Sequence, residues 1–123
     1  MKLKFVALAS VLAATGVFSS QAQADQQLAV SICSYVAADS RNDLRKTLSD
    51  HRLRLRNVYD GILCDGLPLV RHAIRHNAND TADFIIRQLP GSQVASSGDI
   101  EWAESNGFSG SPVIEAIRAR ANS

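Results

Sequence analysis

The sequence predicts an all-α domain, a small bundle of about five helices with a central antiparallel helical hairpin and one disulfide. Three observations lead to this fold class. Apolar residues recur every three or four positions over most of the chain after residue 25, which is the helical repeat. Capping residues and prolines stand where the expected helices begin, and the chain has two cysteines, Cys33 and Cys64.

The first 24 residues have the composition of an export signal. Lys2 and Lys4 give it a positive start, and residues 5–18 form its apolar middle. Ala22-Gln23-Ala24 is a cleavage site of the small-x-small type. We therefore expect cleavage after Ala24 and a periplasmic location, with an uncleaved N-terminal anchor as the alternative. No later segment of the sequence approaches the roughly 18 apolar residues of a membrane-spanning helix.

The composition of the sequence predicts how the chain is organised. The expected organisation is a signal peptide (1–24), a helical two-cysteine domain (25–90), a linker (91–98) and a C-terminal helical tail that packs on the domain (99–123). Loss of the signal leaves 11 of the 13 Lys and Arg residues against 12 Asp and Glu, so the net charge of −1 predicts no particular partner. The distribution is uneven, because residues 41–56 are strongly basic and residues 99–115 contain no Lys or Arg.

The two cysteines are expected to form a structural disulfide. An exported chain with two cysteines usually oxidises them, and a Cys33–Cys64 bridge closes a loop of about 30 residues, worth roughly 3–4 kcal/mol. The alternative is a reactive thiol pair. Redox pairs normally stand as C-x-x-C at a helix start, whereas these two cysteines lie far apart in the sequence.

Residues 41–60 allow two interpretations. The segment from Arg52 to Arg56 alternates charged and apolar residues like a strand. Apolar positions from Leu44 to Ile62, however, recur at spacings of four and three over about five helical turns. The longer pattern favours one helix with His51 on its apolar stripe, while a break near Asp50 stays open.

The remaining helices are predicted from apolar spacing, caps and prolines. They are residues 26–38, 67–77, 81–89, 99–105 and 113–121. Helices 67–77 and 81–89 are joined by a short connection, so we expect them to pack as an antiparallel hairpin.

Four arginines of the 41–60 segment fall in one stripe beside its apolar face when the segment is drawn as a helix. This arginine stripe consists of Arg41, Arg45, Arg52 and Arg56. Arginine binds phosphate through its planar fork, so the stripe is a candidate site for anionic envelope lipid or an acidic protein surface. The alternatives are a solvated face, or a stripe covered by the acidic tail with Trp102.

A second polar face is predicted on helix 67–77, opposite its apolar side. His72 and His76 stand four residues apart, which suits a metal pair, but the neighbouring arginines oppose a dication and no zinc-protease glutamate follows His72. We expect a solvated face without metal or cofactor, with a pH-dependent anion site as an alternative. Together the two faces give eight candidate anion-binding residues: Arg41, Arg45, Arg52, Arg56, Arg71, His72, Arg75 and His76.

Several short motifs point to a known family. They are SICSYV (residues 31–36), LRLRNVYDGI (53–62), CDG (64–66) and residues 69–78. On these motifs residues 26–90 resemble the domain of unknown function 3718 family of small exported two-cysteine bacterial proteins. Asp65 and Pro68 stand where the family usually has Asn and Ser, so no polar role is carried over to position 68. The resemblance implies an exported two-cysteine domain and no established activity.

The sequence contains no nucleophile motif and no phosphate-binding loop. We therefore predict a non-enzymatic binding or interaction module of the cell envelope. The alternatives are a small metal-dependent or hydrolytic enzyme that uses His72 and His76, and a structural or stress-abundant envelope protein. We expect no nucleic-acid partner, because the expected compartment is the periplasm and the basic face lacks interleaved aromatic residues.

Overall fold

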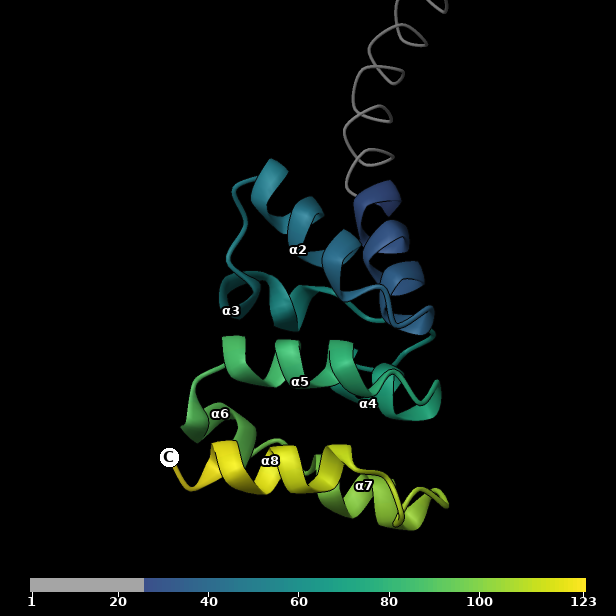
Figure 1. Cartoon of the computed structure of the whole chain (residues 1–123), viewed down its shortest axis with the longest axis vertical. Helices are drawn as coiled ribbons and strands as arrows, with labels where there is room; N and C mark the ends of the chain where they lie inside the picture. The colour runs from purple at the N-terminus through teal and green to yellow at the C-terminus, as the bar shows by residue number, and fades with distance from the viewer. Residues whose placement is uncertain (1–25) are drawn as a thin grey trace, which may run out of the picture. The chain divides into compact units, whose positions relative to one another are not determined.

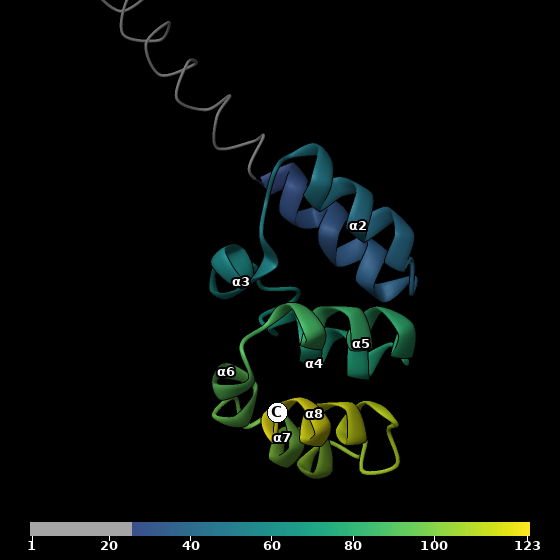
Figure 2. The same cartoon turned by 60° about the vertical axis from the view of Figure 1, so that its left-hand side comes forward.

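The computed structural model describes residues 26–123. The predicted signal peptide, residues 1–24, lies outside the described residues. The chain divides after residue 30, and the second unit consists of residues 31–123. The named helices, the disulfide and the cavities all belong to the second unit (Figures 1 and 2).

The described part of the chain is helical and contains no strand, which confirms the predicted all-α fold with one disulfide. Residues 26–37 are helical. The elements that follow are α2 (Arg41–Asp50), α3 (Leu55–Val58), the 3-10 turn η1 (Tyr59–Gly61), α4 (Leu69–Arg75), α5 (Asn79–Gln88), α6 (Gly91–Ala95), α7 (Asp99–Ser105) and α8 (Val113–Ala121).

The segment 41–60 is not one helix, so the interpretation favoured by its periodicity is wrong and the break near Asp50 is what occurs. Helix α2 ends at Asp50, and Arg52 adopts a left-handed conformation with φ 53°. The Leu53 amide donates to the Leu48 carbonyl at 2.8 Å, which closes the end of the helix. His51 is exposed here instead of lying on an apolar stripe.

The predicted antiparallel hairpin is formed by α4 and α5 at the centre of the unit (Figure 1). Pro68 precedes α4, where its missing N–H costs no helical hydrogen bond. Asn77 turns the chain with φ 55°, and Ala78 donates to the Ala73 carbonyl at 2.9 Å. The fully buried Ile74 and Ile85 place the apolar core inside this hairpin.

Helix α5 lies between two layers. It contacts α2 and α3 on one side and α8 on the other, as Figures 1 and 2 both show. Residues 91–98, expected as a linker, include α6, which packs closely on α8. A Cβ atom added at Gly91 would stand 2.8 Å from the Arg120 carbonyl oxygen, so this contact leaves no room for a side chain.

The disulfide joins Cys33 in the helical segment 26–37 to Cys64 ahead of α4. Cys64 and Leu67 exchange backbone hydrogen bonds of 2.8 and 3.0 Å around a tight turn. Asp65 and Gly66 have φ values of 53° and 82°, and these residue types tolerate such values best. The bridge thereby fixes residues 31–37 to the start of the hairpin.

Within residues 26–123, the helices are all too short or too polar to span a membrane. The same part of the chain contains no group of three or more His, Cys, Asp or Glu side chains that could hold a metal ion.

Candidate functional site

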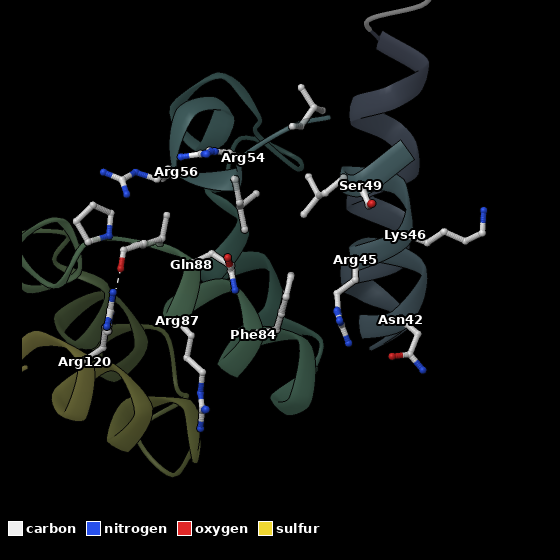
Figure 3. A pocket seen from close by; sticks show the side chains of 15 residues that line it. Asn42, Arg45, Lys46, Ser49, Arg54, Arg56, Phe84, Arg87, Gln88 and Arg120 are labelled. Atoms are coloured by element: carbon white, nitrogen blue, oxygen red, sulfur yellow. Dashed lines mark hydrogen bonds between the residues drawn. The ribbon is translucent and has the colours of Figure 1, made fainter. Parts of the chain in front are cut away.

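A cavity of about 830 Å³ lies between α2, α3, α5 and the end of α8 (Figure 3). Six cationic side chains line it: Arg45, Lys46, Arg54, Arg56, Arg87 and Arg120. None of the described residues that line it is Asp or Glu. We call this cavity the basic pocket.

The break between α2 and α3 shapes this pocket. Arg45 projects from α2, whereas Arg54 precedes α3 in extended conformation and Arg56 lies within α3. A continuous helix would place Arg54 on the face opposite Arg45 and Arg56. Because the chain turns at Arg52, the basic residues of the two short helices instead border a common hollow with Arg87 of α5.

Part of the lining of the basic pocket is apolar. Six lining residues carry no polar side-chain group: Leu48, Leu53, Leu55, Phe84, Leu89 and Pro90. Leu48, Leu55 and Leu89 are buried core residues, while Leu53 and Phe84 are half-buried and present apolar surface to the cavity. In Figure 3, Phe84 lies between Arg45 and Arg87. The pocket thus combines cationic groups with accessible hydrocarbon.

Four of the six cations have no carboxylate partner among the described residues, and one of these, Arg120, donates instead to a backbone carbonyl. Among the described residues, no Asp or Glu oxygen lies within 4.0 Å of a charged nitrogen of Arg45, Arg54 or Arg56. Because arginine stays protonated at any physiological pH, these three groups keep a permanent positive charge at the pocket.

The other three cations are engaged within the fold. Lys46 pairs with Asp50 at 2.9 Å on the exposed surface of α2, and this carboxylate raises the pKa of Lys46. Arg87 pairs with Asp83 at 3.0 Å.

Arg120 donates from Nε to the Leu89 carbonyl at 2.9 Å, the dashed line in Figure 3. This bond orients the Arg120 guanidinium at the edge of the pocket, and its remaining N–H groups stay available as donors.

The arginine stripe is divided by the fold. Arg45 and Arg56 line the basic pocket. Arg41 lines a separate, smaller cavity of about 330 Å³ together with Asp39, Asp43 and Asp80. Arg52 is exposed in the left-handed turn and lines neither cavity. The structure therefore brings together two of the four predicted residues.

Arg71 of α4 has partners inside the fold. Its Nε donates to Asp99 Oδ1 at 2.7 Å and its Nη2 to the Ser97 carbonyl at 3.0 Å. The guanidinium also lies 5.6 Å from the centre of the Trp102 ring. Asp99 and Trp102 of the acidic C-terminal segment thus contact Arg71, which is not part of the arginine stripe that the alternative interpretation placed under this segment.

His72 is buried, which corrects its expected place on a solvated face. Its Nε2 lies 3.1 Å from the Cys33 carbonyl, and its Nδ1 lies 3.3 Å from Nη2 of Arg75. Because an arginine nitrogen can only donate, Nδ1 accepts and Nε2 carries the proton that reaches the carbonyl. Burial is the main cause that lowers the pKa of His72, and nearby His76 and Arg75 act in the same direction.

The two remaining candidates lie at the exposed edge of α4. Arg75 pairs with Asp65 at 3.1 Å in the turn after Cys64. His76 is exposed, and its ring centre lies 4.6 Å from that of His72. Since both ring nitrogens of His72 already have hydrogen-bond partners, the histidine pair does not present two free metal ligands.

Sequence reasoning missed several residues of the basic pocket. These are Lys46, Arg54, Phe84, Arg87 and Arg120. The alternation of Arg52 to Arg56 was a signal for Arg54, because it marked extended backbone inside a helical pattern. Arg87 and Arg120 come from α5 and α8, and only the packing of those helices brings them to the same cavity.

Comparison with known protein families gives one match. The model of the family described as a protein of unknown function, DUF3718, matches residues 32–96, which is more than half of the chain. This match confirms the resemblance seen in the sequence and extends past Pro90 to residue 96. Neither the curated proteins nor the solved structures gave a match.

Proposed function

The chain belongs to the DUF3718 family, and we propose that it is an exported, non-enzymatic binding module of the cell envelope that holds a partner's oxyanion group in the basic pocket. The observation that carries this proposal is the composition of the pocket. Six cations and no carboxylate border one concave, partly apolar cavity of about 830 Å³. A cavity of this size lies within the range of about 300–1,000 Å³ that is usual for ligand sites.

The kinds of cation favour an oxyanion. Five of the six are arginines, whose planar fork donates two parallel hydrogen bonds to a phosphate or a carboxylate. Arg45, Arg54 and Arg56 lack a carboxylate partner among the described residues, so their donors are available to a ligand. A bound anion would also relieve repulsion between like charges around the cavity.

The pocket is better suited to binding than to catalysis. Among the described residues that line it, there is no His, Cys, Asp or Glu that could act as a general base or acid near neutral pH, and so none that could activate Ser49. The alternative enzyme with His72 and His76 has less support, because His72 is buried and hydrogen-bonded on both ring nitrogens.

Export is supported by two features. Residues 1–24 have the composition of a cleavable signal, and the Cys33–Cys64 bridge is a kind of bond that persists in oxidising compartments. Intact-mass measurement on a periplasmic extract tests this part of the proposal. We expect a chain that begins at Asp25, and a full-length chain or a cytoplasmic location would contradict it.

Anion binding is tested with pyrophosphate as the probe. The protein is produced from its full sequence and purified as the cell processes it, and titration calorimetry measures pyrophosphate affinity. The double variant Arg45→Ala/Arg56→Ala should bind about tenfold more weakly, because it removes two charge-assisted contacts. Rising salt should weaken binding by the native protein.

The matched control is Arg41→Ala/Arg52→Ala. It removes the same number of positive charges from the same stretch of chain, but neither residue lines the basic pocket. We expect its affinity to stay within about twofold of the native value, since only distant surface charge is lost. Equal losses in both double variants would show that binding follows net charge and would overturn the pocket as the site.

A further inference from the structure

The apolar lining of the basic pocket exceeds what a bare oxyanion requires. Leu53 and Phe84 are only half-buried, so each leaves hydrocarbon surface facing the cavity. A site for a small hydrated anion would normally surround it with polar donors. Here the cationic groups border a hydrocarbon surface, and covering that surface with an apolar part of the ligand would itself favour binding.

The polar uncharged lining is too sparse for a peptide. Only Asn42, Ser49 and Gln88 supply such groups. A peptide segment brings one N–H and one C=O per residue, and each of these must find a partner when water is excluded. The pocket has no exposed strand edge that could pair with such a backbone, because the part of the chain that the structure describes is helical.

From these observations we propose that the ligand is a single-chain anionic amphiphile, with one phosphate or carboxylate headgroup on one alkyl chain. The proposal rests on the proposed function and names its ligand class. The headgroup ligands come from Arg45, Arg54 and Arg56, because their donors have no carboxylate partner among the described residues. In Figure 3, Arg45 lies on one side of the cavity and Arg54 and Arg56 on the other, so one headgroup contacts one of these two sides. The alkyl chain packs on Leu53 and Phe84.

The test is a chain-length series of alkyl phosphates. Butyl, hexyl and octyl phosphate are titrated into the native protein below the concentration at which they form micelles, with pyrophosphate as the reference anion. Each methylene that leaves water contributes roughly 0.8 kcal/mol when fully buried, so affinity should rise about two- to fourfold per added methylene in this open pocket. Affinity that does not change with chain length overturns the amphiphile and leaves the anion site standing.

Variants separate the two parts of the pocket. Phe84→Gln should flatten the dependence of affinity on chain length, because it removes apolar surface and no charge. Leu63→Gln is the control, since Leu63 is 57% exposed and lies outside the pocket. If Phe84→Gln fails to fold, Leu53→Gln replaces it, and the series on the native protein decides the proposal without any variant.

Three further results of these titrations would overturn the proposed amphiphile ligand. Binding to vesicles of anionic lipid without binding to monomeric octyl phosphate would overturn the proposal in favour of a membrane-surface site. Tighter binding of an acidic peptide than of octyl phosphate would overturn it in favour of a protein partner. Absence of binding by every alkyl phosphate and by pyrophosphate would overturn both this inference and the proposed function.

Discussion

Two regions of this protein are rich in arginine, and they differ in where the positive charge finds its partner. On α4, Arg71 pairs with Asp99 at 2.7 Å and Arg75 with Asp65 at 3.1 Å. In the basic pocket, Arg45, Arg54 and Arg56 have no such partner among the described residues. The same residue type therefore stabilises the fold in one region and leaves its donors available to a ligand in the other.

The difference comes from topology and not from composition. Helix α7 packs on α4 and brings Asp99 to Arg71, while the turn after Cys64 brings Asp65 to Arg75. Helix α5 packs against α2 and α3, but among the described residues its carboxylates form no ion pair with Arg45, Arg54 or Arg56, which stay at an open cavity. Binding sites often keep interactions unsatisfied at some cost in stability, and the basic pocket has this character.

The largest effect should come from the bond that anchors the α4 region. Replacing both cysteines, Cys33→Ser/Cys64→Ser, should lower the free energy of unfolding by about 3–4 kcal/mol, because the bridge closes a loop with a sequence separation of 31. Urea unfolding followed by circular dichroism measures this. A loss below about 1 kcal/mol would mean that the hairpin holds residues 31–37 without the bridge.

The next prediction compares how much a buried and an exposed ion pair contribute to the free energy of unfolding. Asp99→Asn leaves Arg71 without its charge partner, and since Asp99 is almost fully buried we expect a loss of about 1–3 kcal/mol in unfolding free energy. Glu115→Gln breaks the exposed pair with Arg118 and should cost at most about 0.5 kcal/mol. Equal costs in urea unfolding would contradict the contrast between the two regions.

A smaller effect concerns pH. Burial lowers the pKa of His72 below its ordinary value of 6.5, so between the lowered and the ordinary pKa the unfolded state binds more protons. Stability should be complete above pH 6.5 and should fall as the pH decreases through this window. His72→Gln removes the titrating group that faces Arg75 and His76.

Urea unfolding near pH 7.5 and near pH 5 should show a smaller acid loss for this variant than for the native protein. An identical acid loss in both proteins would assign the pH dependence to other groups.

The smallest effect on stability belongs to the pocket. Arg45→Ala and Arg54→Ala should change the free energy of unfolding by less than about 0.5 kcal/mol, because both side chains are exposed and have no carboxylate partner among the described residues. Arg71→Ala is the comparison and should cost more, since it strands Asp99 in a buried position. Thermal unfolding of the three variants ranks them, and a pocket variant as damaging as Arg71→Ala would show that the pocket arginines are structural.

Much of the fold could be predicted from the sequence, because each helix has its own local signal. Apolar spacing and prolines located the central hairpin, and cysteine count with the expected compartment predicted the disulfide. Helix α6 had no such signal, since Gly91 and Ser92 are poor helix formers and the helix is held by its packing on α8. The left-handed Arg52 was equally hidden, because no glycine marks that turn.

The candidate site was harder to predict than the fold. Arg45 and Arg56 were found because they share one segment, whereas Arg87 and Arg120 reach the pocket from distant helices. His72 was misplaced for a related reason. The sequence pattern of α4 shows one apolar stripe, and the opposite, polar side was therefore expected to face solvent. In the structure the Cys33 carbonyl contacts His72 on that side, and α7 also packs against α4.

The position of α5 between two layers has a consequence for handling this protein. The matched family segment ends at residue 96, yet Ile114 and Ile117 of α8 are buried in the same core as Ile85 and Ile86 of α5. A chain cut after residue 96 would keep both cysteines and the whole matched segment but expose one face of α5 to water. Such a fragment is expected to aggregate, so the stretch of sequence that defines the family is shorter than the unit that folds.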